Sequence, residues 1–145
     1  MGLPTEGYSL EEVAMDRVAH FEIAVDDKDK AREFYSSVFG WQIMDVPVQM
    51  AGDTGTYTAA TTTPTDPQTQ MPTEPGGING AIVERTGAIS GPVITIYVES
   101  IYDCLEKVTA AGGTIVAGRQ EIQGMGAYAY VTDVSGNVVG LWESA

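Results

Sequence analysis

Val18-Ala-His-Phe-Glu-Ile-Ala-Val25 is the stretch of sequence on which the interpretation of the fold depends. Its side chains alternate in character, which is typical of a β-strand whose two faces meet different surroundings. Phe21 and Ile23 fall on one face, which is apolar throughout. His20 and Glu22 fall on the other face. We therefore predict a strand with one apolar face and one partly polar face.

The residues that follow predict a helix and three more strands. Asp26 and Asp27 can cap a helix that runs to about Phe39, and Gly40 can end it. Further strands are expected near residues 41–48, 55–62 and 78–85. A loop rich in Pro and Thr, residues 63–77, comes before the last of these strands. The result is a β-α-β-β-β unit.

A second unit with the same order of elements follows later in the chain. Residues 93–98 alternate as the first strand does, and Ser100 can cap a helix that stops at Gly112-Gly113. Strands are again expected near residues 114–117, 127–132 and 137–143. We interpret the recurrence as an internal duplication, in which a shift of 73 positions places His20 on Val93.

A duplicated unit of this kind predicts an α+β fold. Two β-α-β-β-β modules, at about residues 17–86 and 91–144, would form a cupped mixed sheet with the helices on the outside. At 145 residues, 43% of them hydrophobic, the chain can bury one core, so residues 17–145 are expected to form a single domain. Residues 1–16 would be an N-terminal extension, with a helix-capping box at Ser9-Leu-Glu-Glu12.

The charge and cysteine content exclude several classes of protein. Twenty Asp and Glu stand against seven Lys and Arg, a formal net charge of -13, which disfavours nucleic-acid binding. No run approaches the roughly 20 apolar residues of a membrane helix. Cys104 is the sole cysteine, so no internal disulfide can form, and a cytoplasmic location is expected. The acidic surface fits a protein from a high-salt organism or an ordinary acidic bacterial protein.

The chain resembles the vicinal oxygen chelate superfamily, which includes glyoxalases, bleomycin-resistance proteins and extradiol dioxygenases. The resemblance runs from about Arg17 to Glu143 and implies two β-α-β-β-β modules around a cupped sheet. The stretches that carry it are His20-Phe-Glu-Ile-Ala-Val-Asp-Asp27, Ala31-Arg-Glu-Phe-Tyr-Ser-Ser-Val-Phe-Gly-Trp41, Ile94-Thr-Ile-Tyr-Val98 and Thr132-Asp-Val-Ser-Gly-Asn-Val-Val-Gly-Leu-Trp-Glu143.

The resemblance also implies a divalent metal site, but most of its ligands are missing here. Metal-using members hold the ion through His and Glu on the first and last strands of both modules, and His20 matches one of these positions. Val93 stands at a second position and Gly140 at a third, and neither side chain can donate. The fourth position falls at or beside Gly80, with Glu84 as the nearest acid. We expect no metal; a bound ion would use His20 and Glu84.

His20 and Glu22 are the candidate catalytic residues, because they share one strand face and could transfer a proton. They could equally be a structural hydrogen-bonded pair. Glu143 should point away from the cup, by strand alternation. An aromatic and hydroxyl lining suited to an organic ligand is predicted. The predicted ligand-binding residues are Thr95, Tyr97, Tyr128, Tyr130 and Trp142.

Three functions remain open from the sequence. The first is a metal-independent protein that binds a small apolar or aromatic ligand in the cup. The second is a lyase or isomerase that uses His20 and Glu22 for proton transfer, or one divalent metal ion at His20. The third is an accessory domain that binds a partner protein and whose cup is filled by its own side chains. A homodimer is also expected, because two four-stranded cups would leave strand edges exposed.

Overall fold

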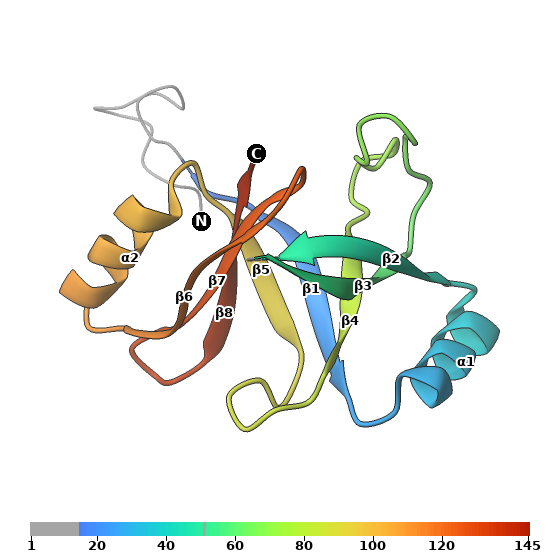
Figure 1. The fold of residues 1–145 in the computed structure, drawn as a ribbon, viewed down its shortest axis with the longest axis horizontal. Coiled ribbons are helices and arrows are strands. Elements are labelled where there is room, and N and C mark those ends of the chain that lie inside the picture. Colours follow the sequence, from blue (N-terminus) through green and yellow to red (C-terminus); the bar gives the residue numbers. More distant parts are fainter. Residues whose placement is uncertain (1–14, 51) are drawn as a thin grey trace, which may run out of the picture.

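The computed structural model describes residues 15–50 and 52–145, so the capping box expected at residues 9–12 lies outside the described residues. Figure 1 shows eight strands with one helix after β1 and a second helix after β5. In chain order they are β1 (Val18–Val25), α1 (Lys28–Phe39), β2 (Gln42–Met50), β3 (Asp53–Thr61), β4 (Asn79–Glu84), β5 (Val93–Tyr97), α2 (Ile101–Ala110), β6 (Thr114–Ile122), β7 (Gly126–Thr132) and β8 (Val138–Ser144). A curved mixed sheet with two helices confirms the predicted α+β class. Neither of these helices is long and apolar enough to cross a membrane.

The strands join into one closed barrel in the order β1-β4-β3-β2-β6-β7-β8-β5. β1 runs parallel to β4 and β5 runs parallel to β8, whereas the other neighbouring pairs are antiparallel. One seam is narrow, since β2 meets β6 through the pair Met50 and Ile122. Over the rest of their length β2 and β6 do not pair with each other, so most of these two edges stays unpaired in the described residues, as the predicted cup implies. These unpaired edges leave the homodimer a prediction.

Helix α1 begins and ends at the predicted residues. Asp27 Oδ1 accepts a hydrogen bond from the Lys30 backbone N–H at 3.1 Å, which caps the first turn. Gly40 adopts φ 73°, in the left-handed region, and its N–H donates to the Ser36 carbonyl at 3.0 Å. Ala31 anchors the helix in an apolar cluster on the outer faces of β2, β3 and β4. The helix therefore covers one outer face of the barrel.

Helix α2 covers the outer face at the other end of the molecule (Figure 1). Ser100 caps it as predicted, because its hydroxyl accepts a hydrogen bond from the Asp103 N–H at 3.2 Å. A Glu143 carboxylate oxygen accepts a second one from the Ile101 N–H at 2.8 Å. Ile101 is fully buried in an apolar cluster with residues of β7 and β8. Glu143 thus faces the helix, as strand alternation predicted.

Strand β7 shows how the helices determine which side chains face the interior of the barrel. Ala127, Ala129 and Val131 are buried in the cluster beneath α2. Successive side chains on a strand point to opposite faces, so Tyr128 and Tyr130 must point the other way. The small residues allow α2 to pack closely on the outer face of the strand, and the two tyrosines line the interior of the barrel.

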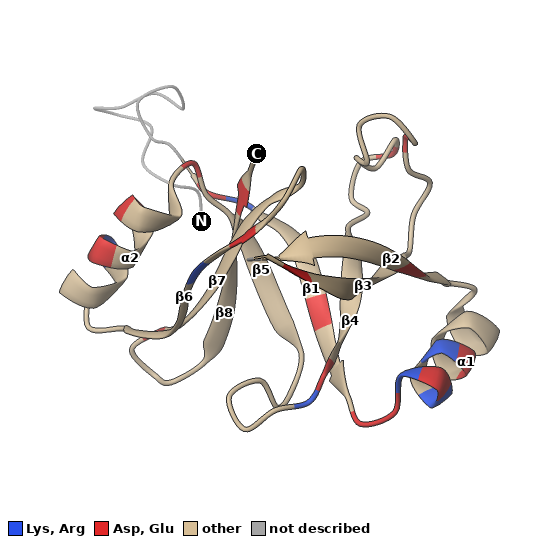
Figure 2. Cartoon of the chain, viewed as in Figure 1, with Lys and Arg blue, Asp and Glu red and all other residues tan. Residues whose placement is uncertain are grey.

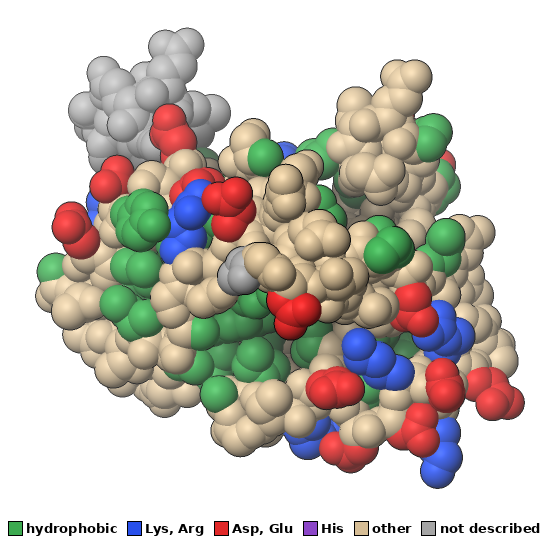
Figure 3. Space-filling view, in the orientation of Figure 1, with side chains coloured by type: hydrophobic (Ala, Val, Ile, Leu, Met, Phe, Trp, Pro, Cys, Tyr) green, Lys and Arg blue, Asp and Glu red, His purple; other side chains and the backbone are tan. Residues whose placement is uncertain are grey.

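Acidic residues occur on both helices and on the central strands (Figure 2), and hydrophobic side chains gather near the middle of the face shown in Figure 3. With a net charge of -13, the folded chain repels itself. We expect the melting temperature to climb between dilute buffer and 1 M KCl, where the Debye length is about 3 Å. The effect should shrink near the isoelectric point of about 4.1. A flat or falling melting curve at neutral pH would contradict the high-salt interpretation.

Candidate functional site

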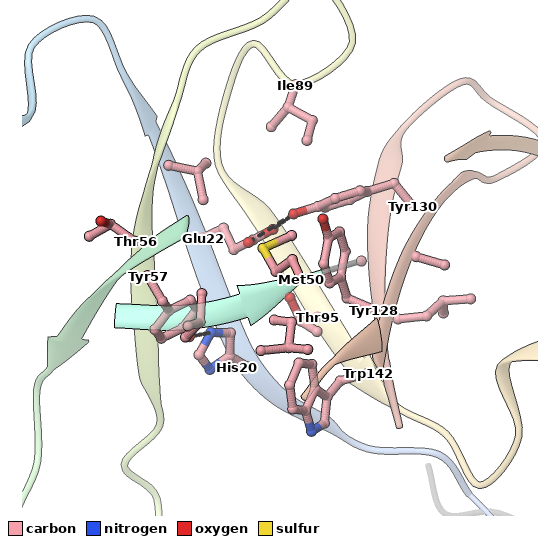
Figure 4. A pocket seen from close by; sticks show the side chains of 16 residues that line it. His20, Glu22, Met50, Thr56, Tyr57, Ile89, Thr95, Tyr128, Tyr130 and Trp142 are labelled. Atoms are coloured by element: carbon pink, nitrogen blue, oxygen red, sulfur yellow. Dashed lines mark hydrogen bonds between the residues drawn. The ribbon is translucent and has the colours of Figure 1, made fainter. Parts of the chain in front are cut away.

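The barrel holds a cavity of about 300 Å³ that opens to solvent on one side and whose lining is mostly apolar and aromatic. Its size is at the lower end of the range of small-molecule sites in proteins. Figure 4 shows the labelled side chains converging on this space from several strands. The polar and aromatic members are His20 and Glu22 of β1, Tyr57 of β3, Thr95 of β5, Tyr128 and Tyr130 of β7, and Trp142 of β8.

Glu22 is the carboxylate of this cavity, and its side chain is bound by a tyrosine. The Tyr130 hydroxyl lies 2.6 Å from one Glu22 carboxylate oxygen and 2.9 Å from the other (Figure 4). Burial raises the pKa of the Glu22 carboxyl, and the hydrogen bond from Tyr130 opposes part of that rise. Burial also raises the pKa of Tyr130, with the nearby Glu22 charge adding to the effect. Tyr130 therefore stays the proton donor of the pair.

His20 is paired with a different tyrosine. Its Nε2 lies 2.9 Å from the Tyr57 hydroxyl, and burial lowers the pKa of the imidazole to about 4. The ring is therefore neutral at pH 7. A Tyr57 hydroxyl whose own pKa is raised by burial can donate to it. The alternative of a structural hydrogen-bonded pair of His20 and Glu22 does not hold in the described structure, since each side chain bonds to its own tyrosine.

Thr95 carries a hydroxyl that lacks a partner within the cavity. The residue is 6% exposed, and its Oγ1 has no hydrogen-bond partner among the described residues. Gly140 lies directly beside it in the register of β5 and β8. A Cβ at position 140 would lie 2.9 Å from Thr95 Oγ1, so the glycine leaves the hydroxyl free. A buried, unpaired hydroxyl costs about 1–3 kcal/mol, which a ligand could recover by hydrogen bonding to it.

The structure brings most of the predicted lining residues together. Thr95, Tyr128, Tyr130 and Trp142 all line the cavity. Tyr97 is not among its lining residues. The Tyr97 hydroxyl instead contacts the Ser144 hydroxyl, and the Arg17 guanidinium lies 5.6 Å from the centre of its ring.

Tyr57 is the aromatic residue of the cavity that the sequence analysis did not predict, and several apolar lining residues, such as Met50 and Val83, were not predicted either. Its strand, β3, alternates Gly55, Tyr57 and Ala59 with three threonines, so neither face is clearly apolar. Strand alternation groups these residues but cannot say which group faces the interior. The available signal was Tyr57 itself, since it is the one aromatic side chain of the strand.

The donor atoms around the cavity do not fit a divalent metal. A Cβ added to Gly80 would lie 2.5 Å from the Phe21 ring, so this face of β4 is turned toward the cluster beneath α1. Glu84 shares that face by alternation and is exposed, which corrects the expectation that it could face the cavity. Val93 lies opposite Glu22 and offers no donor. No group of three His, Cys, Asp or Glu in the described residues could hold an ion.

Glu143 is committed to the outer face of the barrel. Besides capping α2, it lies 2.9 Å from an Arg119 guanidinium nitrogen, and this hydrogen bond holds the pKa of the Glu143 carboxyl below its usual range. Of the four metal-ligand positions that the family resemblance implies, His20 is thus the one whose side chain places a metal-binding atom in the cavity. A stable zinc or nickel site needs three or four protein ligands.

The chain belongs to the Glyoxalase/Bleomycin resistance protein/Dioxygenase superfamily, whose family model matches residues 17–141. Two curated mycobacterial proteins, from Mycobacterium bovis and Mycobacterium tuberculosis, are each named "Putative glyoxylase CFP32" and are 29% identical to it over 125 residues. The alignment covers 85% of this chain and 44% of each relative, so the chain spans less than half of their length.

Solved structures show the same fold at low sequence identity. A Streptomyces coelicolor methylmalonyl-CoA epimerase in complex with 2-nitronate-propionyl-CoA has a TM-score of 0.60 and 17% identity, over 91% of this chain and 99% of that one. A hypothetical protein from Bacillus halodurans, BH1468, has a TM-score of 0.56 and 15% identity, over 91% and 96%. At these identities the likeness concerns the fold alone.

Proposed function

We propose that this chain is a metal-independent binding protein whose barrel cavity holds a small organic ligand. The observation that carries the proposal is the unpartnered Thr95 hydroxyl inside an aromatic cavity. Small-molecule sites are typically concave and apolar, with a few polar groups that orient the ligand. The epimerase of the same fold, in complex with a CoA derivative, supports a ligand in this kind of domain.

The size of the cavity argues against the accessory domain with a filled cup. Side chains that filled the barrel would leave no space of about 300 Å³ at its centre. The second candidate, a lyase or isomerase, is favoured by one observation, the raised pKa of Glu22. A carboxylate in this state is a suitable proton acceptor. In such an enzyme the proton would be transferred by Glu22, with Tyr130 as its hydrogen-bond partner, and not by the His20–Glu22 pair that the sequence suggested.

Binding of 2-phenylethanol tests the proposed function, because this probe is neutral, aromatic and able to hydrogen bond to Thr95. Trp142 lines the cavity, so a Trp41→Phe variant leaves it as the single tryptophan reporter. Its fluorescence should change saturably, with a Kd of about 0.1–5 mM for so small a probe. Val83→Phe places a ring at a lining position and should weaken binding at least about tenfold.

The matched control is Val134→Phe, which adds the same ring at a position that is 75% exposed. It should leave the Kd within about twofold, because it changes no cavity atom. Equal Kd values for the Val83→Phe and Val134→Phe variants would place any binding outside the cavity and contradict the proposal.

We expect the purified protein to hold well under one equivalent of divalent metal. His20 Nε2 is engaged by Tyr57, and Val93 and Gly140 offer no donor side chain. Sites with one or two protein ligands lose their ions to water and buffer. Elemental analysis after dialysis without chelator measures this directly. One equivalent of zinc, nickel, iron or manganese that disappears in a His20→Ala variant would contradict this prediction and would show that His20 is part of a metal site.

We propose that the chain forms a homodimer, which is supported by the unpaired edges of β2 and β6 and by an apolar surface. Four large apolar side chains on and beside α1 are more than half exposed: Phe34, Val38, Phe39 and Met44. Exposed apolar clusters of this kind are often association surfaces. Sedimentation at micromolar concentration would report a species of 15.4 kDa if the chain stays monomeric.

A further inference from the structure

We infer that the cavity selects an organic cation, with an amine or ammonium group carried on a small apolar or aromatic body. The inference rests on the proposed binding function and deepens it, because it names the chemical class of the ligand. Three features support it: the charges around the cavity, the rings that surround the carboxylate, and the small number of hydrogen bonds that the protein donates to this carboxylate.

The charge of the cavity has one sign. Glu22 is its single acidic side chain, and no Lys or Arg of the described chain lines it. His20 adds no positive charge at neutral pH, because burial keeps the imidazole neutral. A carboxylate, phosphate or sulfate on a ligand would find no counter-charge here and would be repelled by Glu22. An ammonium group would find an opposite charge in a poorly solvated site, where Coulomb attraction is strong.

The rings around this carboxylate suit a cation. Tyr57, Tyr128, Tyr130 and Trp142 project into the same space as Glu22 (Figure 4). Tyr128 and Tyr130 meet edge to face, with ring centres 5.8 Å apart. Ring faces attract ammonium groups, an interaction of about 2 kcal/mol or more when the cation is desolvated. A set of aromatic rings with one carboxylate therefore favours a cation over a neutral ligand of equal size.

Glu22 has hydrogen-bonding capacity that the described protein groups do not use. The residue is 9% exposed, and the side-chain hydrogen bonds to its carboxylate in the described structure all come from the Tyr130 hydroxyl. Two carboxylate oxygens can accept about four hydrogen bonds. Burying a charge is costly unless it is paired. An ammonium ligand would supply both the counter-charge and the missing donors, and the Thr95 hydroxyl could bind a second polar group of the same molecule.

Three probes of nearly equal size and different charge test the inference: 2-phenylethylamine, 2-phenylethanol and phenylacetate. Isothermal titration in 0.5 M KCl at pH 7.5 screens the surface charge of the protein. We expect the amine to bind at least about tenfold more tightly than the alcohol, and phenylacetate to bind at least about tenfold more weakly. An amine that binds no more tightly than the alcohol would overturn the charge inference and leave the proposed binding function standing.

Two variants test whether Glu22 is the residue that favours the cation. The quantity compared is the Kd of 2-phenylethanol divided by the Kd of 2-phenylethylamine. Glu22→Gln keeps an acceptor for Tyr130 but removes the charge, so the ratio should fall from about ten or more to about one. Glu33→Gln removes an equal charge from an exposed position on α1 and should leave the ratio unchanged. A ratio that survives Glu22→Gln would overturn the assignment to this carboxylate. Failure of all three probes to bind would overturn the inference together with the proposed function.

Discussion

Replacing Gly126 with alanine should lower the free energy of unfolding by about 3 kcal/mol. Gly126 begins β7 with φ +152°, a conformation that side-chain-bearing residues rarely adopt. A Cβ there would overlap the Glu143 carbonyl oxygen and lie 2.8 Å from the Trp142 ring. Neither the Glu143 backbone nor the Trp142 ring can move aside by a small rotation, so β7 and β8 would have to separate to make room for the new methyl group. Urea denaturation followed by circular dichroism measures the change.

Gly118→Ala is the matched control, because a Cβ at position 118 would meet nothing within 4 Å. This variant should stay within about 0.5 kcal/mol of the wild-type protein. Because Trp142 lines the cavity, Gly126→Ala should also weaken 2-phenylethanol binding in whatever fraction remains folded. Equal stability of the two variants would contradict the close packing of β7 against β8.

The titration of His20 should have its midpoint at about pH 4, well below the ordinary value of 6.5. His20 is the single histidine of the chain, so its ring resonances in an NMR titration need no assignment. Its depressed pKa makes stability depend on pH in a known direction. Between pH 6.5 and pH 4 the unfolded chain takes up a proton that the folded chain refuses, so the folded state loses stability as the pH falls. The loss reaches roughly 3 kcal/mol.

A His20→Gln variant isolates this effect. Gln can still hydrogen bond to Tyr57 but takes up no proton, so the wild-type protein should lose more stability than the variant as the pH falls from 6.5 to 4. The raised pKa of Glu22 works the other way, because the folded state holds that proton more firmly and gains stability at low pH. Comparison of the two proteins largely removes the Glu22 contribution. A His20 midpoint near 6.5 would show that the imidazole is solvated and that the cavity is open to bulk water.

Features encoded in a few neighbouring residues were predictable from the sequence. Asp27, Gly40 and Ser100 cap the helices as expected, since a cap depends on residues within one turn of it. The outward direction of Glu143 followed from strand alternation alone. The same rule correctly grouped Tyr128 with Tyr130, because the small apolar residues between them leave no doubt about which face meets the helix.

Features that depend on distant contacts were not predictable in the same way. Closure of the barrel through Met50 and Ile122 joins residues that no local pattern connects. Glu84 was placed by alternation from Gly80, and the error arose because Gly80 itself faces the helix layer, against Phe21. The tyrosine partners of His20 and Glu22 come from β3 and β7, 37 and 108 positions away in the sequence. The sequence could therefore name the candidate residues more readily than their pairings.

A crystal structure of the chelator-treated protein with 2-phenylethylamine would test the central claim most directly. The account predicts ligand density inside the barrel, with the amine beside the Glu22 carboxylate, the ring among the lining tyrosines, and no ion at His20. A cavity that holds only ordered water at a saturating concentration of the amine, or one in which the lining side chains have collapsed into the space, would contradict it.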